Sequence, residues 1–78
     1  MKARVRLVFP DSLVREPVLA RLIRRFDVEP NIRRAAVEEG AGWVVCELDG
    51  DTNAVEDAVV WLEEAGVSVE RLGDVLES

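Results

Sequence analysis

The chain has 78 residues, of which 49% are hydrophobic and 33% are charged, and its formal net charge is −6 at pH 7. This composition indicates a globular protein rather than a disordered one, and the length predicts a single domain over residues 1–78. The apolar runs are too short for membrane insertion and no secretory pattern opens the chain, so we expect a cytoplasmic protein. One cysteine and no histidine exclude an internal disulfide and argue against a zinc site.

The charges are distributed unevenly along the chain. Residues 1–35 carry nine basic and four acidic side chains, whereas residues 36–78 carry one basic and twelve acidic side chains. A basic half can indicate a nucleic-acid partner. No basic tail or cluster stands apart from the predicted elements, so we expect instead that the two halves lie side by side and neutralise each other.

The first predicted element is a strand over residues 2–9, because apolar and polar side chains alternate there. Its apolar face consists of Ala3, Val5, Leu7 and Phe9. A helix follows within residues 15–26, with Pro17 in its first turn. The apolar stripe of this helix consists of Val18, Leu19, Leu22, Ile23 and Phe26.

Residues 27–40 predict a second strand whose alternation shifts by one residue between Ile32 and Ala35, which indicates a β-bulge. Pro30 cannot donate a ladder hydrogen bond, so we expect it on an edge strand or among the first residues of a strand. The glycines of residues 40–42 supply a turn, and alternation over residues 43–50 completes a hairpin. In the latter strand Cys46 is expected to face the helices as a buried, unreactive thiol.

A second helix is predicted over residues 50–66, where Asp51, Thr52 and Asn53 are all suitable N-caps, Asn53 and Glu56 have capping-box spacing, and Gly66 ends the helix. Its apolar stripe consists of Val55, Ala58, Val59, Leu62 and Ala65, with Trp61 near the border. A strand over residues 67–72 and a short tail follow. The order β-α-β-β-α-β predicts the ferredoxin-like α+β fold, a four-stranded antiparallel sheet with both helices on one face. The arginines of the first helix are then expected to approach the acidic residues of the second.

The sheet face without helices carries an apolar centre ringed by charges. This centre consists of Val8, Trp43 and Val45, and together with the neighbouring Arg6 it is predicted as an interface, with a second copy of the chain as partner. A tryptophan beside valines is typical of an interface core with a polar rim. The alternative is that these apolar side chains are exposed by chance and form no interface. The aliphatic parts of neighbouring arginine side chains would then cover some of their surface.

The residues needed for RNA binding or catalysis are incomplete. RNA recognition on this fold uses several aromatic residues on the central strands, where this chain offers Trp43 alone, and the negative net charge also argues against a nucleic-acid partner. Arg15 and Asn31 match in type the arginine and asparagine of an acylphosphatase, but residues 10–17 hold no glycine to present N–H groups to a phosphate. We therefore expect no enzyme activity and no cofactor.

Asn31 is an unusual residue for a strand, since asparagine is depleted there. Two interpretations remain open from the residues alone. Its amide stabilises the bend at Pro30, or it serves a ligand or partner.

The order of these features resembles the NIL domain family, which is named for an Asn-Ile-Leu triplet on its second strand. The matching residues here are Asn31, Ile32 and Arg33, so that an arginine replaces the family's leucine. Ala35, the hairpin glycine, the strand ending in ELDG, and the segments EPVLARL and AVVWLEEAGVSVERL follow the family pattern as well. The resemblance implies that Asn31, Ile32 and Arg33 bind an amino acid such as methionine or a related sulfur compound, and that two domains pair as a homodimer.

The best-known members of this family are C-terminal regulatory domains of methionine-import ABC ATPases, and others are fused to iron–sulfur ferredoxin modules. The resemblance therefore implies a transporter or ferredoxin partner. The sequence shows neither a phosphate-binding loop nor a cysteine cluster, so we expect a stand-alone regulatory module. The alternative is a subunit that binds no ligand and docks on a ferredoxin or transport partner.

Overall fold

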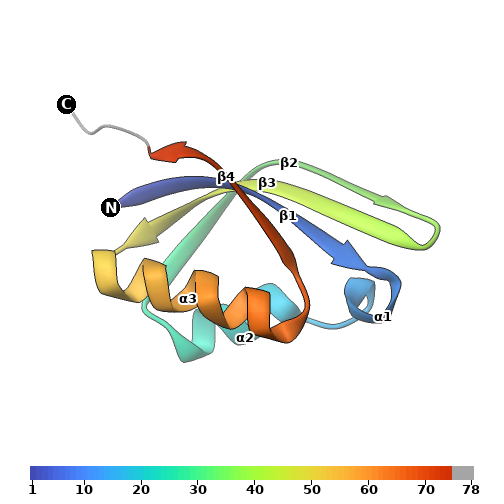
Figure 1. Cartoon of the computed structure of the whole chain (residues 1–78), viewed down its shortest axis with the longest axis horizontal. Coiled ribbons are helices and arrows are strands. Elements are labelled where there is room, and N and C mark those ends of the chain that lie inside the picture. The colour runs from blue at the N-terminus through green and yellow to red at the C-terminus, as the bar shows by residue number, and fades with distance from the viewer. Residues whose placement is uncertain (75–78) are drawn as a thin grey trace.

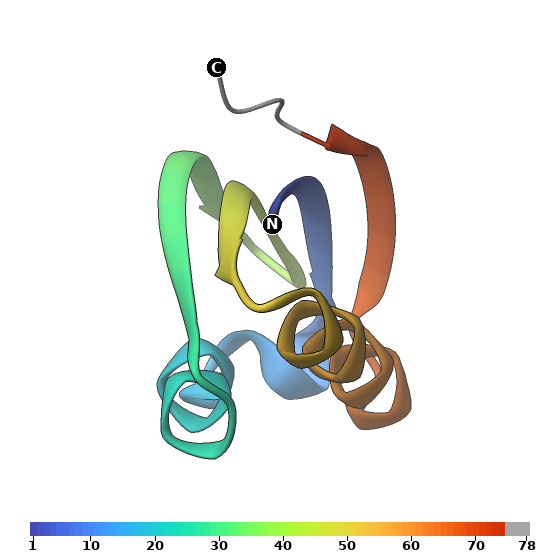
Figure 2. The ribbon, with the colours of Figure 1, turned by 90° about the vertical axis from the view of Figure 1, so that its left-hand side faces the viewer.

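A computed structural model describes residues 1–74 as a four-stranded sheet with helices on one side (Figure 1). In chain order the elements are β1 (Lys2–Pro10), α1 (Asp11–Val14), α2 (Val18–Arg25), β2 (Val28–Glu38), β3 (Ala41–Gly50), α3 (Thr52–Ala65) and β4 (Ser68–Asp74). The strand order is β2-β3-β1-β4, and all neighbours are antiparallel. Seen end-on, the helices lie below the sheet, and no described element covers its other face, which we call the open face (Figure 2). The predicted ferredoxin-like α+β fold is confirmed.

The core lies between the sheet and the helices, as the alternation in β1 predicts. The four inward residues of β1, from Ala3 to Phe9, are all buried. They pack with Leu22 of α2, Leu48 of β3 and Leu62 of α3, each of which is fully buried. Burying one such side chain contributes about 1.5–3 kcal/mol to the free energy of unfolding. Among the described residues no polar or charged side chain is buried, so the core is held by apolar contact alone.

Both helices bury narrower stripes than the sequence predicts. α2 has only eight residues, and Ile23, which lies about 100° around the helix from Leu22, is 53% exposed. Ala65, the last residue of α3, is also exposed. The predicted places of Ile23 and Ala65 in the buried stripes are therefore wrong. Each lies beyond the area in which its helix contacts the sheet.

The predicted capping box of α3 is also wrong. The N-cap residue is Asp51, one of the three predicted candidates, but no side chain forms a capping hydrogen bond. Glu56 accepts a hydrogen bond from Arg71 of β4, with an N–O distance of 2.8 Å. The C-terminus follows the prediction, since Gly66 adopts the left-handed conformation with φ of 104°.

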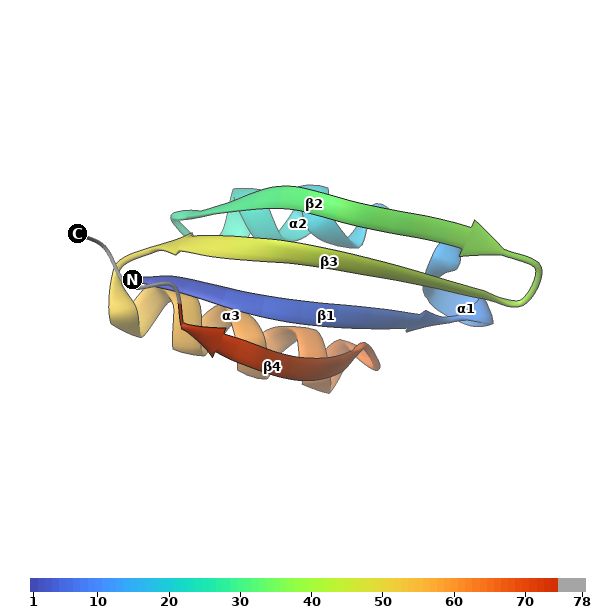
Figure 3. The ribbon, with the colours of Figure 1, turned by 90° about the horizontal axis from the view of Figure 1, so that it is seen from above.

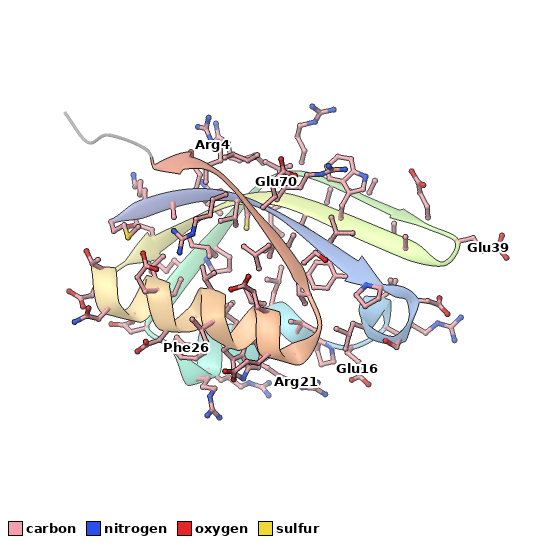
Figure 4. The ribbon with its side chains drawn as sticks, in the orientation of Figure 1. Arg4, Glu16, Arg21, Phe26, Glu39 and Glu70 are labelled. Atoms are coloured by element: carbon pink, nitrogen blue, oxygen red, sulfur yellow. The ribbon has the colours of Figure 1, made fainter. Side chains whose placement is uncertain are left out.

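Neutralisation between the two halves of the chain takes place across the sheet rather than between the helices. Arg4 binds Glu47 at 2.8 Å, and Arg6 lies 3.8 Å from Glu70. Arg4 and Glu70 lie above the sheet, whereas Arg21 lies below it with Glu16, its partner at 3.0 Å (Figure 4). Among the described residues no ion pair joins α2 to α3, so that expectation is wrong.

The bulge predicted in β2 is confirmed. Ile32 lies opposite Cys46 and Arg34 lies opposite Val45, so Arg33 is the extra residue. β2 is an edge strand, in agreement with the position of Pro30. Two further features differ from the prediction: α1 is a single helical turn where only a break was expected, and β4 extends to Asp74. The rest of the predicted tail lies outside the described residues.

Seen from above, the open face is formed by all four strands, and the tip of the β2–β3 hairpin extends beyond the helices (Figure 3). Within the described part of the chain, no helix has both the length and the apolar character needed to cross a bilayer.

Candidate functional site

The three residues predicted to bind a ligand do not share one side of β2. Asn31 lies opposite Glu47 and belongs to the open face, whereas Ile32 lies opposite the buried Cys46 and belongs to the helix side. Arg33 is the bulged residue between the two register segments. The structure therefore places Asn31 and Ile32 on opposite faces of the sheet, and only Asn31 and Arg33 are available to one ligand on the open face.

Asn31 lines a polar hollow of about 340 Å³ on the open face. The other residues that line it are Lys2, Glu29, Pro30, Glu47 and Asp49. Among the described residues the Asn31 side chain has no hydrogen-bond partner, so no contact supports the interpretation in which its amide stabilises the bend at Pro30. An unpartnered amide beside carboxylates is suited to binding a small polar group.

The electrostatics of the hollow are dominated by Glu47 and the arginines around it. The hydrogen bond from Arg4 lowers the pKa of the Glu47 carboxyl, and the positive charge of Arg33 lowers it further. Glu47 is therefore ionised at neutral pH and already neutralised by Arg4. Glu29 and Asp49 form no ion pair with a described residue, which leaves them available to an ammonium group.

The four predicted interface residues lie together on the open face. In the β1–β3 ladder Arg6 is opposite Val45 and Val8 is opposite Trp43. The Arg6 guanidinium lies 5.6 Å from the centre of the Trp43 ring. Their proximity is established, whereas their role as an interface remains a prediction.

A second arginine, which sequence reasoning missed, also contacts the tryptophan. The Arg34 guanidinium lies 5.9 Å from the Trp43 ring centre, so Trp43 receives cation–π contacts from Arg6 of β1 and Arg34 of β2. The signal for Arg34 was the predicted bulge, because a bulge interrupts alternation and changes which side chains point to a given face.

An apolar pocket of about 240 Å³ lies on the opposite side of the sheet, between the hairpin and the segment from α1 to α2. Its apolar lining includes Phe9, Val14, Leu19, Ala35, Val37 and Val44. Gly42 also lines it, and a Cβ at that position would meet Val14 and Val37 side chains at 3.7 and 4.0 Å. The sequence did not predict this pocket, because α1, one of its walls, was not predicted.

Cys46 contributes to neither cavity as a reactive group. Its side chain is fully buried, and burial, assisted by the charge of Glu47, raises the pKa of the thiol to about 11. At neutral pH the thiolate population is negligible, in agreement with the predicted packing role.

Comparison with known proteins agrees with this fold. The NIL domain profile matches residues 3–71. A methionine import ATP-binding protein of Acinetobacter baylyi is 36% identical over 73 residues, which cover 88% of this chain and 21% of that protein. The corresponding protein of Symbiobacterium thermophilum is 38% identical over 71 residues, which cover 86% of this chain and 21% of that protein.

The chain spans about a fifth of the length of these curated relatives. The C-terminal domain of an ABC transporter ATP-binding protein from Enterococcus faecalis has a similar structure, with a TM-score of 0.79 and 23% identity, over 94% of this chain and 86% of that one. This likeness supports the fold, and the sequence match supports the family. The chain belongs to the NIL domain family.

Proposed function

We propose that the chain is a non-catalytic, cytoplasmic regulatory module that binds an amino acid, methionine or a related sulfur compound, at or near a homodimer interface. The relatives named as methionine import proteins support this ligand class. The observation that carries the proposal is the hollow around Asn31, whose amide has no partner among the described residues. Binding sites of this kind place a few polar groups so that they fix the orientation of the ligand.

The hollow is suited to the head group of an amino acid. Glu29 and Asp49 are carboxylates available to the α-ammonium group, and the Asn31 amide can donate to or accept from either end of the head group. Arg33, next to the hollow, supplies a positive charge for the carboxylate.

One copy of the chain offers little apolar surface for the side chain of such a ligand. The lining of the hollow is polar apart from Pro30, and the next open-face residue along β3 is Val45. Ile32, which the resemblance assigns to the site, points to the other side of the sheet. The site is therefore completed by a second copy, which supports binding at a homodimer interface.

Thermal unfolding in the presence of L-methionine tests this function. A ligand present at one hundred times its dissociation constant adds about 2.7 kcal/mol to stability. For a domain of this size that gain raises the Tm by roughly 10–20 °C. D-methionine and L-glutamine serve as controls for stereochemistry and side chain. The absence of any shift with L-amino acids or related sulfur compounds at millimolar concentration would contradict amino-acid sensing.

The variant Asn31→Ala should abolish most of the ligand-induced shift while leaving the Tm without ligand nearly unchanged, because Asn31 makes no hydrogen bond to a described residue. Asn53→Ala is the matched control, since Asn53 is exposed in the first turn of α3 and forms no capping bond. A large loss of stability in Asn31→Ala would show that this asparagine supports the fold instead.

The second candidate function is a ligand-free interaction subunit that docks on a ferredoxin or transport partner. The apolar pocket favours it, because the pocket opens beside a strand whose helix side exposes Ile32 and Val37, by 53% and 78%. Val37→Asp should then abolish binding of a purified partner in calorimetry without changing the response to methionine.

A further inference from the structure

The open face of the sheet has an acidic end and a basic end. The acidic end holds Glu29 and Asp49, which face each other across β2 and β3 and have no ion-pair partner among the described residues. Lys2 and Arg4 lie at the same end, where Arg4 is occupied by Glu47.

The basic end is created by the bulge in β2. Arg33 and Arg34 are adjacent in sequence, yet both act on the open face: Arg34 contacts the Trp43 ring, and Arg33 is close enough to influence the pKa of Glu47. Neither has a carboxylate within 4 Å among the described residues. A regular strand would send one of the two arginines to the helix side.

The two ends are offset along the strands rather than across them. On β2, the acidic Glu29 lies four residues before the basic Arg33. On β3, which runs in the opposite direction, the acidic Asp49 lies six residues after Trp43 at the basic end. At about 3.3 Å per residue the charged ends lie roughly 13–20 Å apart. Val45, Val8 and the half-buried Trp43 provide apolar surface at the basic end.

We propose that two copies pack open face to open face with their strands running in opposite directions, so that Arg33 and Arg34 of each copy lie over Glu29 and Asp49 of the other. The two-fold axis then crosses the strands near Asn31 and Glu47. This arrangement deepens the proposed function and rests on its homodimer. The partner's Arg34 and the partner's Trp43 cover the hollow around Asn31, adding a second cation to that of Arg33 and the apolar wall that one copy lacks.

Symmetry and charge together favour this orientation over others. A two-fold contact repeats each pairing twice, so one complementary offset brings all four unpaired charges of each copy close to opposite charges of the other, and the same charged groups also face the head group of a ligand in the hollow. Rotation about an axis along the strands would place the arginines over arginines, and like charges at an interface are strongly unfavourable. A nucleic acid is a poorer occupant, because a strand of several phosphates would pass from two arginines onto Glu29 and Asp49.

Reciprocal charge reversal tests this pairing in the intact chain. The basic variant carries Glu29→Arg with Asp49→Arg, and the acidic variant carries Arg33→Glu with Arg34→Glu. The controls make the same charge changes on the helix side, where Glu63→Arg with Glu64→Arg lies on α3 and Arg24→Glu with Arg25→Glu lies on α2. Sedimentation equilibrium gives the dimer dissociation constant, and circular dichroism verifies folding.

The wild type and both controls should dimerise, whereas each open-face variant alone should have a dissociation constant at least about 100-fold higher. An equimolar mixture of the two open-face variants should restore the dimer, because opposite charges again face each other. Raising the salt concentration should weaken the wild-type dimer as charges are screened. If a double variant does not fold, Arg34→Glu and Asp49→Arg give the same test as single changes.

Open-face variants that dimerise like the wild type, or a mixture that stays monomeric, would overturn this arrangement. A monomeric wild type would overturn it as well. These outcomes are separable from failure of ligand binding: a chain whose charge-reversed variants recombine, but which methionine does not stabilise, keeps this dimer and loses the sensing function. A chain that responds to methionine and ignores charge reversal keeps the function and loses this dimer.

Discussion

The two faces of the sheet differ in composition, because apolar and polar side chains alternate along its strands. On the helix-covered face every inward residue of β1 is apolar and buried, and the described core contains no polar side chain. On the open face the alternate residues of the same strand are Lys2, Arg4, Arg6 and Val8, three of them charged. One strand thus presents a face that determines the fold and a face that remains available for recognition.

This difference means that substitutions on the two faces should have separate consequences. Apolar contacts on the covered face contribute to the free energy of unfolding, because they remove surface from water. Exposed ion pairs on the open face contribute about 0–1 kcal/mol each, so their arrangement matters more for partners than for stability. The open face can therefore change its ligand or partner without changing the fold.

Two neighbouring residues of α2 give the strongest test of this comparison. Leu22 is fully buried and Ile23 is 53% exposed, although both fall in the apolar pattern of the helix. Leu22→Ala should lower the free energy of unfolding by about 2–5 kcal/mol through lost burial and the resulting cavity. Ile23→Ala should lower it by less than about 1 kcal/mol, since alanine also favours the helix. Urea denaturation of both variants measures the contrast, and equal losses would contradict the observed burial.

Two glycines of β3 provide a smaller, steric test. A Cβ at Gly50 would lie 2.8 Å from the carbonyl oxygen of Asp27, whereas a Cβ at Gly42 would meet nothing closer than 3.6 Å. Gly50→Ala should therefore destabilise the protein by about 1–3 kcal/mol, because backbone has to move. Gly42→Ala should be close to neutral in thermal unfolding and narrow the apolar pocket. Similar melting temperatures for the two variants would show that the backbone near Asp27 can shift at little cost in free energy.

The sequence predicts most of the framework because alternation and breaks report directly on local geometry. The parity shift between Ile32 and Ala35 predicted the bulge, and Pro30 was expected on an edge strand or among the first residues of a strand, both of which the structure confirms. Periodicity did not predict how far α2 covers the sheet, so the exposure of Ile23 was missed. It assigns each residue to a face, but the area of contact depends on helix length and packing.

The candidate site was predicted less completely than the fold. Trp43 was correctly placed on the open face, whereas the face that Asn31 occupies, the contact between Arg34 and Trp43 and the apolar pocket were not foreseen. Both depend on long-range geometry: the reach of an arginine from the neighbouring strand, and a turn of helix packed below a hairpin. Local sequence patterns do not report distances between residues that are far apart in the chain.

The smallest expected effect concerns the open-face pair of Arg4 and Glu47. The hydrogen bond from Arg4 lowers the pKa of Glu47 from 4.5 in the folded state, so the unfolded chain takes up this proton first as the pH falls. The pair therefore stabilises the fold above the unfolded pKa, and this contribution disappears as the pH falls through the lower, folded pKa. Glu47→Gln should be slightly less stable than the wild type at pH 7, and this difference should shrink as the pH falls below 4.5 in urea denaturation.

High salt should also reduce the difference at pH 7, because the pair is partly exposed to solvent. Glu70→Gln is the matched control, since its carboxylate lies 3.8 Å from Arg6 and is more exposed than that of Glu47. Its effect on stability should be smaller still. A Glu47→Gln difference that does not shrink as the pH falls below 4.5 would mean that the glutamate acts through packing, and the open face would then contribute to the fold as the covered face does.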